Sequence, residues 1–157
     1  MFVNQYVKGN VVSRKILSSQ VSAPITWEAA ETALALSEKR FQAGDVEGLI
    51  SKYHDDIVIR FASLPEIRGR EAAKTWLQKR LQRQLNYTLK KVLLAIDGQK
   101  VTRSWTGQWI DSTTKRNMEG RGIEFLQYED GQLVLWDACF HVWEEGKRQE
   151  NEYFDPV

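Results

Sequence analysis

The segment Arg40-Phe41-Gln42-Ala43-Gly44-Asp45-Val46-Glu47-Gly48-Leu49-Ile50 decides how this chain begins to fold. Gly44 stands where the end of a helix favours a left-handed residue. Asp45 follows it directly and is a good N-cap for a second, short helix. Tyr53-His54-Asp55-Asp56 comes next, and then an apolar strand over 57–62 that is rich in β-branched residues. The stretch therefore predicts a helix, a turn, a short helix and a strand in succession.

The segments on either side of this one extend the pattern. Upstream, Thr26 is a plausible cap for a helix that starts at Trp27 and places apolar side chains at helical spacing. Downstream, good helix formers occupy 71–84, and alternating segments follow at 87–96, 100–110, 117–128 and 132–143. Asp97-Gly98 and Asp130-Gly131 are strong hairpin signals. Helices followed by an antiparallel meander predict an α+β domain.

Composition narrows the classes of partner. Lys and Arg number 22 and Asp and Glu 21, so the net charge is only +1. A polyanion-binding protein should carry a basic surplus, so nucleic acid is not the expected partner. Cys139 is the single cysteine, which excludes an internal disulfide and fits a reducing compartment. We expect a cytoplasmic protein with no membrane partner, because no apolar run approaches the length of a membrane span.

Three regions follow from the sequence. Residues 1–22 form an expected flexible N-terminal extension, whose Ser, Arg and Lys content without acids would also suit an organelle transit peptide. Residues 23–143 form the expected domain. Residues 144–157 form an acidic C-terminal tail, either loose or packed along an edge.

Several motifs resemble the SnoaL-like branch of the nuclear transport factor 2-like superfamily. They are Phe41-Gln42-Ala43-Gly44-Asp45, Tyr53-His54-Asp55-Asp56, Ile67-Arg68-Gly69-Arg70-Glu71 and Gly122-Ile123-Glu124-Phe125-Leu126. Ala95-Ile96-Asp97-Gly98 with Ser104-Trp105-Thr106-Gly107 is similar to a subfamily of unassigned function. The resemblance implies a cone-shaped fold in which a curved, mostly antiparallel sheet packs against N-terminal helices around a pocket. It also implies a homodimer that pairs through the outer sheet face.

Strand alternation indicates which side chains face this pocket. In 100–110 the inward set should be Val101, Arg103, Trp105, Gly107 and Trp109, and in 132–143 it should include Trp136. Family register places Gly122 and Glu124 on the same face, where glycine would leave room for a ligand. We therefore expect a small hydrophobic or aromatic ligand to contact Trp105, Trp109, Trp136, Gly122, Ser37 and Arg103.

Glu124 is the strongest candidate for a catalytic residue that transfers a proton. Related SnoaL-like proteins frequently carry an acid at this position, and a carboxylate desolvated among tryptophans would have a pKa raised toward neutrality. The alternative is that Glu124 pairs with Arg60 or Arg103 and closes a buried network.

Two further residues are candidates for catalytic roles. Arg60 would anchor a carbonyl or anionic group in the pocket, its alternative being a solvated outward position. Tyr53 would donate a hydrogen bond to a carbonyl oxygen, its alternative being a core tyrosine.

Other chemistries find less support. His54-Asp55-Asp56 is a weak metal motif, because consecutive side chains point in different directions, so neither metal nor cofactor is expected. Epoxide hydrolases of this fold carry Arg and Asp on the middle strand and Asp on the last, where this chain has Trp105, Gly107 and Ala138. Ketosteroid isomerases carry their base at a position that falls on Arg60 or Phe61 here.

Three functions remain open at this point. The first is a cofactor-independent isomerase, cyclase or dehydratase that uses Glu124 for proton transfer. The second is a non-catalytic ligand-binding protein, and the third is a dimeric protein-interaction module. An unpaired Glu124 would favour the enzyme, and a Glu124 held by arginine would favour the binding protein.

Overall fold

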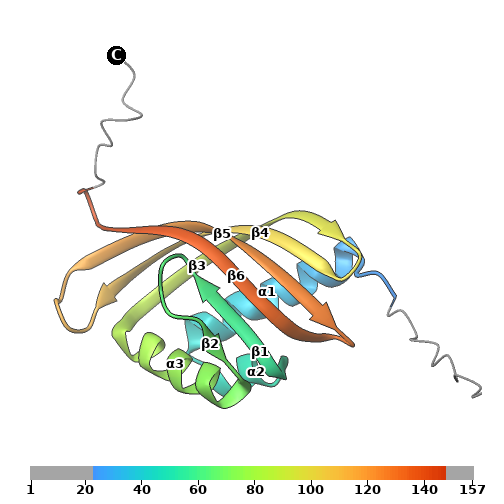
Figure 1. The fold of residues 1–157 in the computed structure, drawn as a ribbon. Helices are drawn as coiled ribbons and strands as arrows, with labels where there is room; N and C mark the ends of the chain where they lie inside the picture. The colour runs from blue at the N-terminus through green and yellow to red at the C-terminus, as the bar shows by residue number, and fades with distance from the viewer. Residues whose placement is uncertain (1–22, 148–157) are drawn as a thin grey trace, which may run out of the picture.

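A computed structural model describes residues 23–147; the expected extension 1–22 and most of the expected tail lie outside these residues. The elements are α1 (Trp27–Ala43), α2 (Val46–Ile50), β1 (Tyr53–Phe61), β2 (Ile67–Arg68), α3 (Arg70–Arg83), β3 (Gln84–Asp97), β4 (Lys100–Asp111), β5 (Asn117–Glu129) and β6 (Gln132–Glu144). The six strands form one sheet in the order β2-β1-β6-β5-β4-β3. Figure 1 shows the long strands arching over the helices. The expected α+β architecture with a curved, mostly antiparallel sheet is confirmed.

The turn at Gly44 has the predicted geometry. Gly44 adopts a φ of 67°, and its backbone N–H donates to the carbonyls of Arg40 and Phe41. Asp45 caps α2, because its Oδ1 accepts a hydrogen bond of 2.8 Å from the Gly48 N–H. Thr26 likewise accepts from the Ala29 N–H at 3.2 Å at the start of α1. These caps fix the angle at which α1 and α2 meet the first strand.

Strand β1 begins at Tyr53, four residues earlier than predicted. Tyr53 pairs with Leu133 of β6, and the register then shifts before Val58 pairs with Leu135. The polar residues between Tyr53 and Val58 lie at this irregularity. Their composition is not typical of a strand, so the sequence did not predict a strand there. Strand β1 runs parallel to β6, whereas the other neighbouring pairs of strands are antiparallel.

Helix α1 covers the free edge of β3. The Glu38 carboxylate accepts a hydrogen bond from the Lys91 backbone N–H, and Gln42 donates from Nε2 to the Leu89 carbonyl at 3.2 Å. Both backbone groups belong to the edge strand and would otherwise be open to pairing with another chain. Helix α1 therefore closes one side of the space beneath the sheet.

Aromatic rings fill the centre of this space. Trp136 is 2% exposed and meets Phe41, Tyr53, Phe61 and Trp76 edge to face, with ring centroids 4.8 to 6.4 Å apart. Such edge-to-face contacts add to the stabilisation from area burial. The core therefore joins both long helices to β1 and β6.

Candidate functional site

The predicted inward faces of β4, β5 and β6 are confirmed by burial. On β4 the buried set includes Val101, Arg103, Trp105 and Trp109, and the intervening residues are more exposed. On β5 the side chains of Glu124 and Leu126 are buried. The alternation of side chains along the strands thus places the Glu124 carboxylate and the Arg103 guanidinium on the buried face of the sheet. Three tryptophans, Trp105, Trp109 and Trp136, share this face.

Glu124 sits in an ion-pair network that spans three strands. Arg103, its direct partner in the β4–β5 register, donates from Nε to Glu124 Oε2 at 2.5 Å. Lys91 of β3 approaches the same oxygen with Nζ at 3.4 Å. The three side chains are between 1% and 9% exposed. Glu124 is therefore held by arginine, which is the alternative that the sequence left open.

The electrostatics of Glu124 contradict the expected pKa. Burial alone would raise its pKa, but attraction to the Arg103 guanidinium and then to Lys91 outweighs burial and lowers the pKa to about 2. A carboxylate with this pKa stays ionised at neutral pH and is a weak proton acceptor. The expectation of a pKa raised toward neutrality was wrong because it assumed desolvation without a partner.

Lys91 is the site residue that sequence reasoning missed. Its Nζ lies 4.8 Å from the centre of the Phe41 ring and 3.5 Å from Ser37 Oγ. Burial, then repulsion from Arg103, lowers the pKa of Lys91 to about 7, although Glu124 opposes the shift. Strand alternation held a signal: on β3 the buried residues Tyr87, Leu89 and Leu93 share the face of Lys91.

Arg60 lies outside the site. Its side chain is half exposed, and Nε donates to Glu66 Oε2 at 2.6 Å. Hydrogen bonding to Glu66 raises the pKa of Arg60, which stays charged. The expected pocket position was wrong because Ile59 and Phe61 take the buried face of β1, and alternation sends Arg60 to the other side.

Tyr53 lies in the interior near the network, and Ser37 is partly buried on α1, where its Oγ faces Lys91 Nζ. Tyr53 is 4% exposed, and burial raises the pKa of its hydroxyl above its usual value. It therefore remains a neutral hydroxyl at physiological pH. Its ring packs against Trp136, so the alternative of a core tyrosine describes its setting.

Gly122 provides space for a tryptophan and not for a ligand. A Cβ atom placed on Gly122 would lie 2.7 Å from Trp105 Nε1 and 2.5 Å from the Cys139 carbonyl oxygen. Gly120 similarly leaves room for the rings of Trp105 and Trp109. The expectation that Gly122 opens the pocket to a ligand was wrong, because these indoles already occupy the room that the glycines leave.

The interior contains two cavities that divide the expected site between them. The first, here the aromatic cavity, measures about 210 Å³, and the residues that define it are Phe61, Trp76, Arg80, Trp105, Trp109 and Phe140. The second, here the α1 cavity, measures about 240 Å³, and the expected residues Ser37, Tyr53, Arg103 and Trp136 line it. Glu124 lines the first and its partner Arg103 lines the second. The ion pair therefore stands between the two cavities.

Arg80 supplies the cation of the aromatic cavity. Its guanidinium carbon lies 5.3 Å from the Trp76 ring centre and 5.9 Å from that of Phe61, and Nε donates to Gln84 Oε1 at 2.9 Å. Within residues 23–147 it makes no ion pair with an acid. A guanidinium in this position retains donors for an oxygen atom of a ligand.

The family model of the SnoaL-like domain matches residues 34–136. The chain belongs to the SnoaL-like family. A comparison with curated proteins gave no significant match. In the part of the SnoaL-like chain that the structure describes, no group of three His, Cys, Asp or Glu side chains could hold a metal ion, and no helix is long and apolar enough to cross a membrane.

Solved structures share the nuclear transport factor 2-like fold of this SnoaL-like protein. An LEH-like epoxide hydrolase from M. tuberculosis is 22% identical, with 70% of this chain and 80% of that chain covered and a TM-score of 0.59. SalBIII, an epoxide hydrolase/cyclase-like enzyme of pyran ring formation in salinomycin, is 13% identical, with coverage of 76% and 100% and a TM-score of 0.63. TerC, co-crystallised with polyporic acid, is 17% identical, with coverage of 71% and 90% and a TM-score of 0.60.

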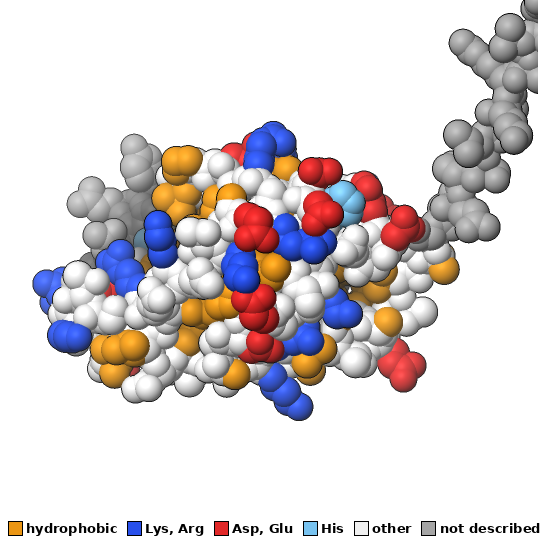
Figure 2. Space-filling model, turned by 90° about the horizontal axis from the view of Figure 1, so that it is seen from below, with side chains coloured by type: hydrophobic (Ala, Val, Ile, Leu, Met, Phe, Trp, Pro, Cys, Tyr) orange, Lys and Arg blue, Asp and Glu red, His pale blue; other side chains and the backbone are white. Residues whose placement is uncertain are grey.

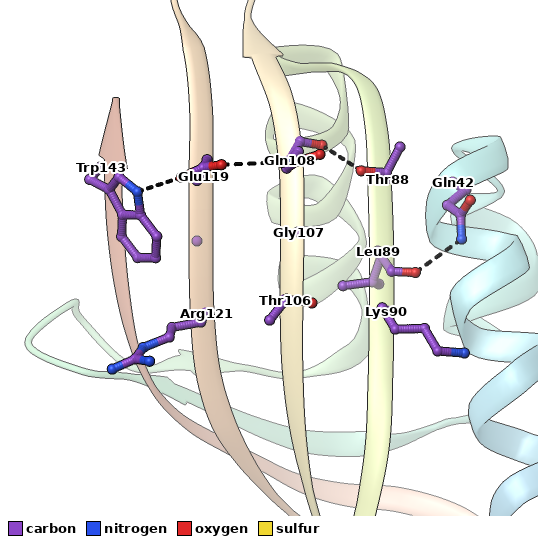
Figure 3. A pocket seen from close by; sticks show the side chains of 11 residues that line it. Gln42, Thr88, Leu89, Lys90, Thr106, Gly107, Gln108, Glu119, Arg121 and Trp143 are labelled. Carbon is purple, nitrogen blue, oxygen red and sulfur yellow. Dashed lines mark hydrogen bonds between the residues drawn. The ribbon is translucent and has the colours of Figure 1, made fainter. Parts of the chain in front are cut away.

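The outer face of the SnoaL-like sheet carries a groove of about 500 Å³, shown in Figure 3. Polar side chains cross it from strand to strand. Trp143 donates from Nε1 to Glu119 at 2.7 Å, and Gln108 donates to the other oxygen of Glu119 at 3.2 Å. Thr88 completes the row by donating to the Gln108 carbonyl at 3.4 Å. These residues are hydrogen-bonded to one another, so they hold each other in place on the surface of the sheet.

The opposite side, which carries the helices and β1, has a mixed charge. Figure 2 shows acidic and basic side chains interspersed along it, with hydrophobic side chains exposed between them. Lys74 of α3 reaches Glu47 of α2 at 2.5 Å, and Arg70 reaches Asp55 of β1 at 2.9 Å. Charges on this side therefore pair locally instead of forming a continuous patch of one sign.

Proposed function

We propose that this SnoaL-like protein binds a small, flat aromatic carbonyl compound in the aromatic cavity, without a cofactor. The observation that carries the proposal is the lining: three indoles and two phenyl rings border the cavity together with Arg80, whose guanidinium lies over the rings of Trp76 and Phe61. Pockets of this kind gain affinity from apolar burial and orientation from a few polar groups. TerC, whose fold is similar, was co-crystallised with polyporic acid, which gives the proposal a precedent within the fold.

Ligand binding without proton transfer by Glu124 is the function that the network supports best. Arg103 and Lys91 both hold the carboxylate, and its pKa of about 2 gives it little drive to accept a proton. Arg80 then replaces Arg60 as the residue that orients a carbonyl oxygen. The tryptophans Trp105 and Trp109 supply stacking area.

A cofactor-independent isomerase, cyclase or lyase is the second candidate. One observation favours it: Glu124 lines the aromatic cavity and would stand near a bound ligand. In such an enzyme, displacement of Arg103 from Glu124 by the ligand would have to precede proton transfer. Tyr53 lines the other cavity, so it would not assist this step.

Titration with acetophenone, beside ethylbenzene as a ligand without the carbonyl, tests the binding proposal. Replacement of Arg80 by Met keeps most of the apolar stem and removes the donors. We expect acetophenone to bind about 3- to 10-fold more weakly to R80M, the usual scale for one lost hydrogen bond, with ethylbenzene unaffected. The matched control is Lys79→Met, an exposed cation one residue away on α3. Equal acetophenone affinities for R80M and the unmodified protein would refute the role of Arg80.

We further propose that two copies pair through the outer sheet face. Val92, Ser104, Ile123 and Cys139 share one row across β3 to β6 in the strand register. Val92 of the edge strand β3 and Ile123 of the inner strand β5 are each more than half exposed, and apolar side chains exposed together on one sheet face are typical of a contact surface. Light scattering of Ile123→Lys should report a monomer, and Leu64→Lys, an exposed site away from this row, is its control. A dimer that survives I123K would contradict the proposed interface.

A further inference from the structure

The α1 cavity has a lining unlike that of the aromatic cavity. Three cationic side chains, Arg40, Lys52 and Arg103, border it, and none of its lining residues is acidic. The acids that pair with two of these cations lie outside the lining: Asp45 is 3.7 Å from Arg40, and Glu124 is 2.5 Å from Arg103. The cavity therefore presents an excess of positive charge toward its contents.

Lys52 is the cation whose charge is free. Its side chain is exposed and forms no ion pair with another residue of the 23–147 segment. Its backbone carbonyl accepts a hydrogen bond of 2.8 Å from the Leu133 N–H, which anchors the residue at the edge of the cavity. An exposed ammonium that forms no ion pair with the described residues is well suited to meet an anionic group that enters from solvent.

Further hydrogen-bond donors line the same cavity. Ser37, Tyr53 and Tyr128, which each carry a hydroxyl, line it, and burial raises the pKa of both tyrosines, so both keep their protons at neutral pH. Trp136 also borders it, and its indole N–H is buried without a hydrogen-bond partner among the described residues. A buried donor without an acceptor is costly, so a ligand that brought an acceptor to this N–H would gain binding free energy.

The remaining walls are apolar. Phe41, Leu49 and Leu133 are buried behind the cavity, whereas Leu36 of α1 is 41% exposed at its border. Apolar walls with donors and cations select a molecule that carries an anionic head on a hydrophobic body. A volume of about 240 Å³ accommodates a body of one aromatic ring.

We propose that the α1 cavity is a second binding site, for a small organic carboxylate of the size of benzoate. The site is separate from the aromatic cavity, because the Arg103–Glu124 ion pair lies between them. The carboxylate meets Lys52 and Arg103, and its hydrophobic body lies against α1. This proposal does not depend on the ligand of the aromatic cavity.

Binding of benzoate, followed through the indole N–H resonances of the tryptophans, tests the proposal. Trp136 lines the α1 cavity, and Trp105 and Trp109 line the aromatic cavity, so benzoate in the α1 cavity should shift the Trp136 signal more than the signals of Trp105 and Trp109. We expect benzoate to shift the Trp136 signal and to bind Lys52→Met about 3- to 10-fold more weakly, as for one lost charge-assisted contact. Benzamide, which has the same shape without the charge, should bind much more weakly than benzoate.

Two control variants separate this site from its alternatives. Lys90→Met removes an exposed cation on the outer face and should leave benzoate affinity unchanged. Arg80→Met should weaken acetophenone binding and leave benzoate binding intact. The proposal is overturned if benzoate affinity responds to R80M but not to K52M, if benzamide binds as well as benzoate, or if benzoate leaves the Trp136 signal in place.

Discussion

Replacement of Lys91 by Met should change how the stability of the protein depends on pH. Lys91 Nζ is buried against Phe41, and both Lys91 and Arg103 pair with Glu124, so two cations share one carboxylate. Methionine fills a similar volume with an unbranched chain and removes the charge. Arg103 still neutralises Glu124 in this variant, which makes the ammonium the main group that is lost.

The size of the effect follows from the pKa of Lys91, which burial lowers from 10.5 to about 7. Between these values the unfolded chain binds a proton that the folded chain does not, so folding stability rises with pH across this window. Below pH 7 both states are protonated, and the contribution no longer changes. Each pH unit in the window changes the free energy of unfolding by about 1.4 kcal/mol. From pH 7 to 9.5 the free energy of unfolding of the unmodified protein therefore rises by at most roughly 3 kcal/mol relative to that of K91M.

Urea unfolding at a series of pH values between 6 and 9.5 measures this difference. The unfolding free energy of the unmodified protein should rise relative to that of K91M, and the two curves should run parallel below pH 7. Lys90→Met is the matched control, because Lys90 is exposed on the outer face and should give parallel curves throughout. If the curves of K91M and the unmodified protein run parallel across the whole range, the claim that burial lowers the pKa of Lys91 is refuted.

Three further substitutions separate packing, charge and surface effects. Gly122→Ala should lower the free energy of unfolding by about 1–3 kcal/mol in urea titrations, because the added Cβ collides with Trp105. Glu124→Gln should cost about 3–5 kcal/mol at pH 7 by leaving Arg103 buried beside a neutral group. Because the pKa of Glu124 is lowered to about 2, this difference should shrink as pH falls from 4.5 toward 2, and a constant difference would contradict the ion pair. Arg60→Met should leave the melting temperature nearly unchanged in a thermal unfolding scan, since the ion pair of Arg60 with Glu66 is exposed to solvent.

Local sequence signals predicted much of the fold. Gly44 and Asp45 specify one backbone turn and one cap, and these depend only on neighbouring residues. The burial of Trp105 and Trp109 followed from a period of two within a single strand. The same period of two holds in β1, where the apolar residues Ile59 and Phe61 assign Arg60 to the exposed face.

The geometry of the site depends on the register between neighbouring strands, which the sequence alone does not specify. Arg103 meets Glu124 because β4 and β5 pair in one register, and Lys91 meets it only through β3, whose register shifts twice along β4. A shift of one residue would send Lys91 to the outer face. The division of the interior into two cavities likewise results from side-chain packing around Trp136, which no spacing rule specifies.

The most direct test of the binding proposal is a crystal structure with acetophenone at pH 7. We expect electron density in the aromatic cavity between Trp76 and Trp105, with the carbonyl oxygen within hydrogen-bond reach of Arg80. We also expect Glu124 to stay paired with Arg103 in the complex. A ligand bound elsewhere would contradict the proposed binding site, and a Glu124 carboxylate that leaves Arg103 to contact the ligand would contradict binding without proton transfer and favour an enzyme.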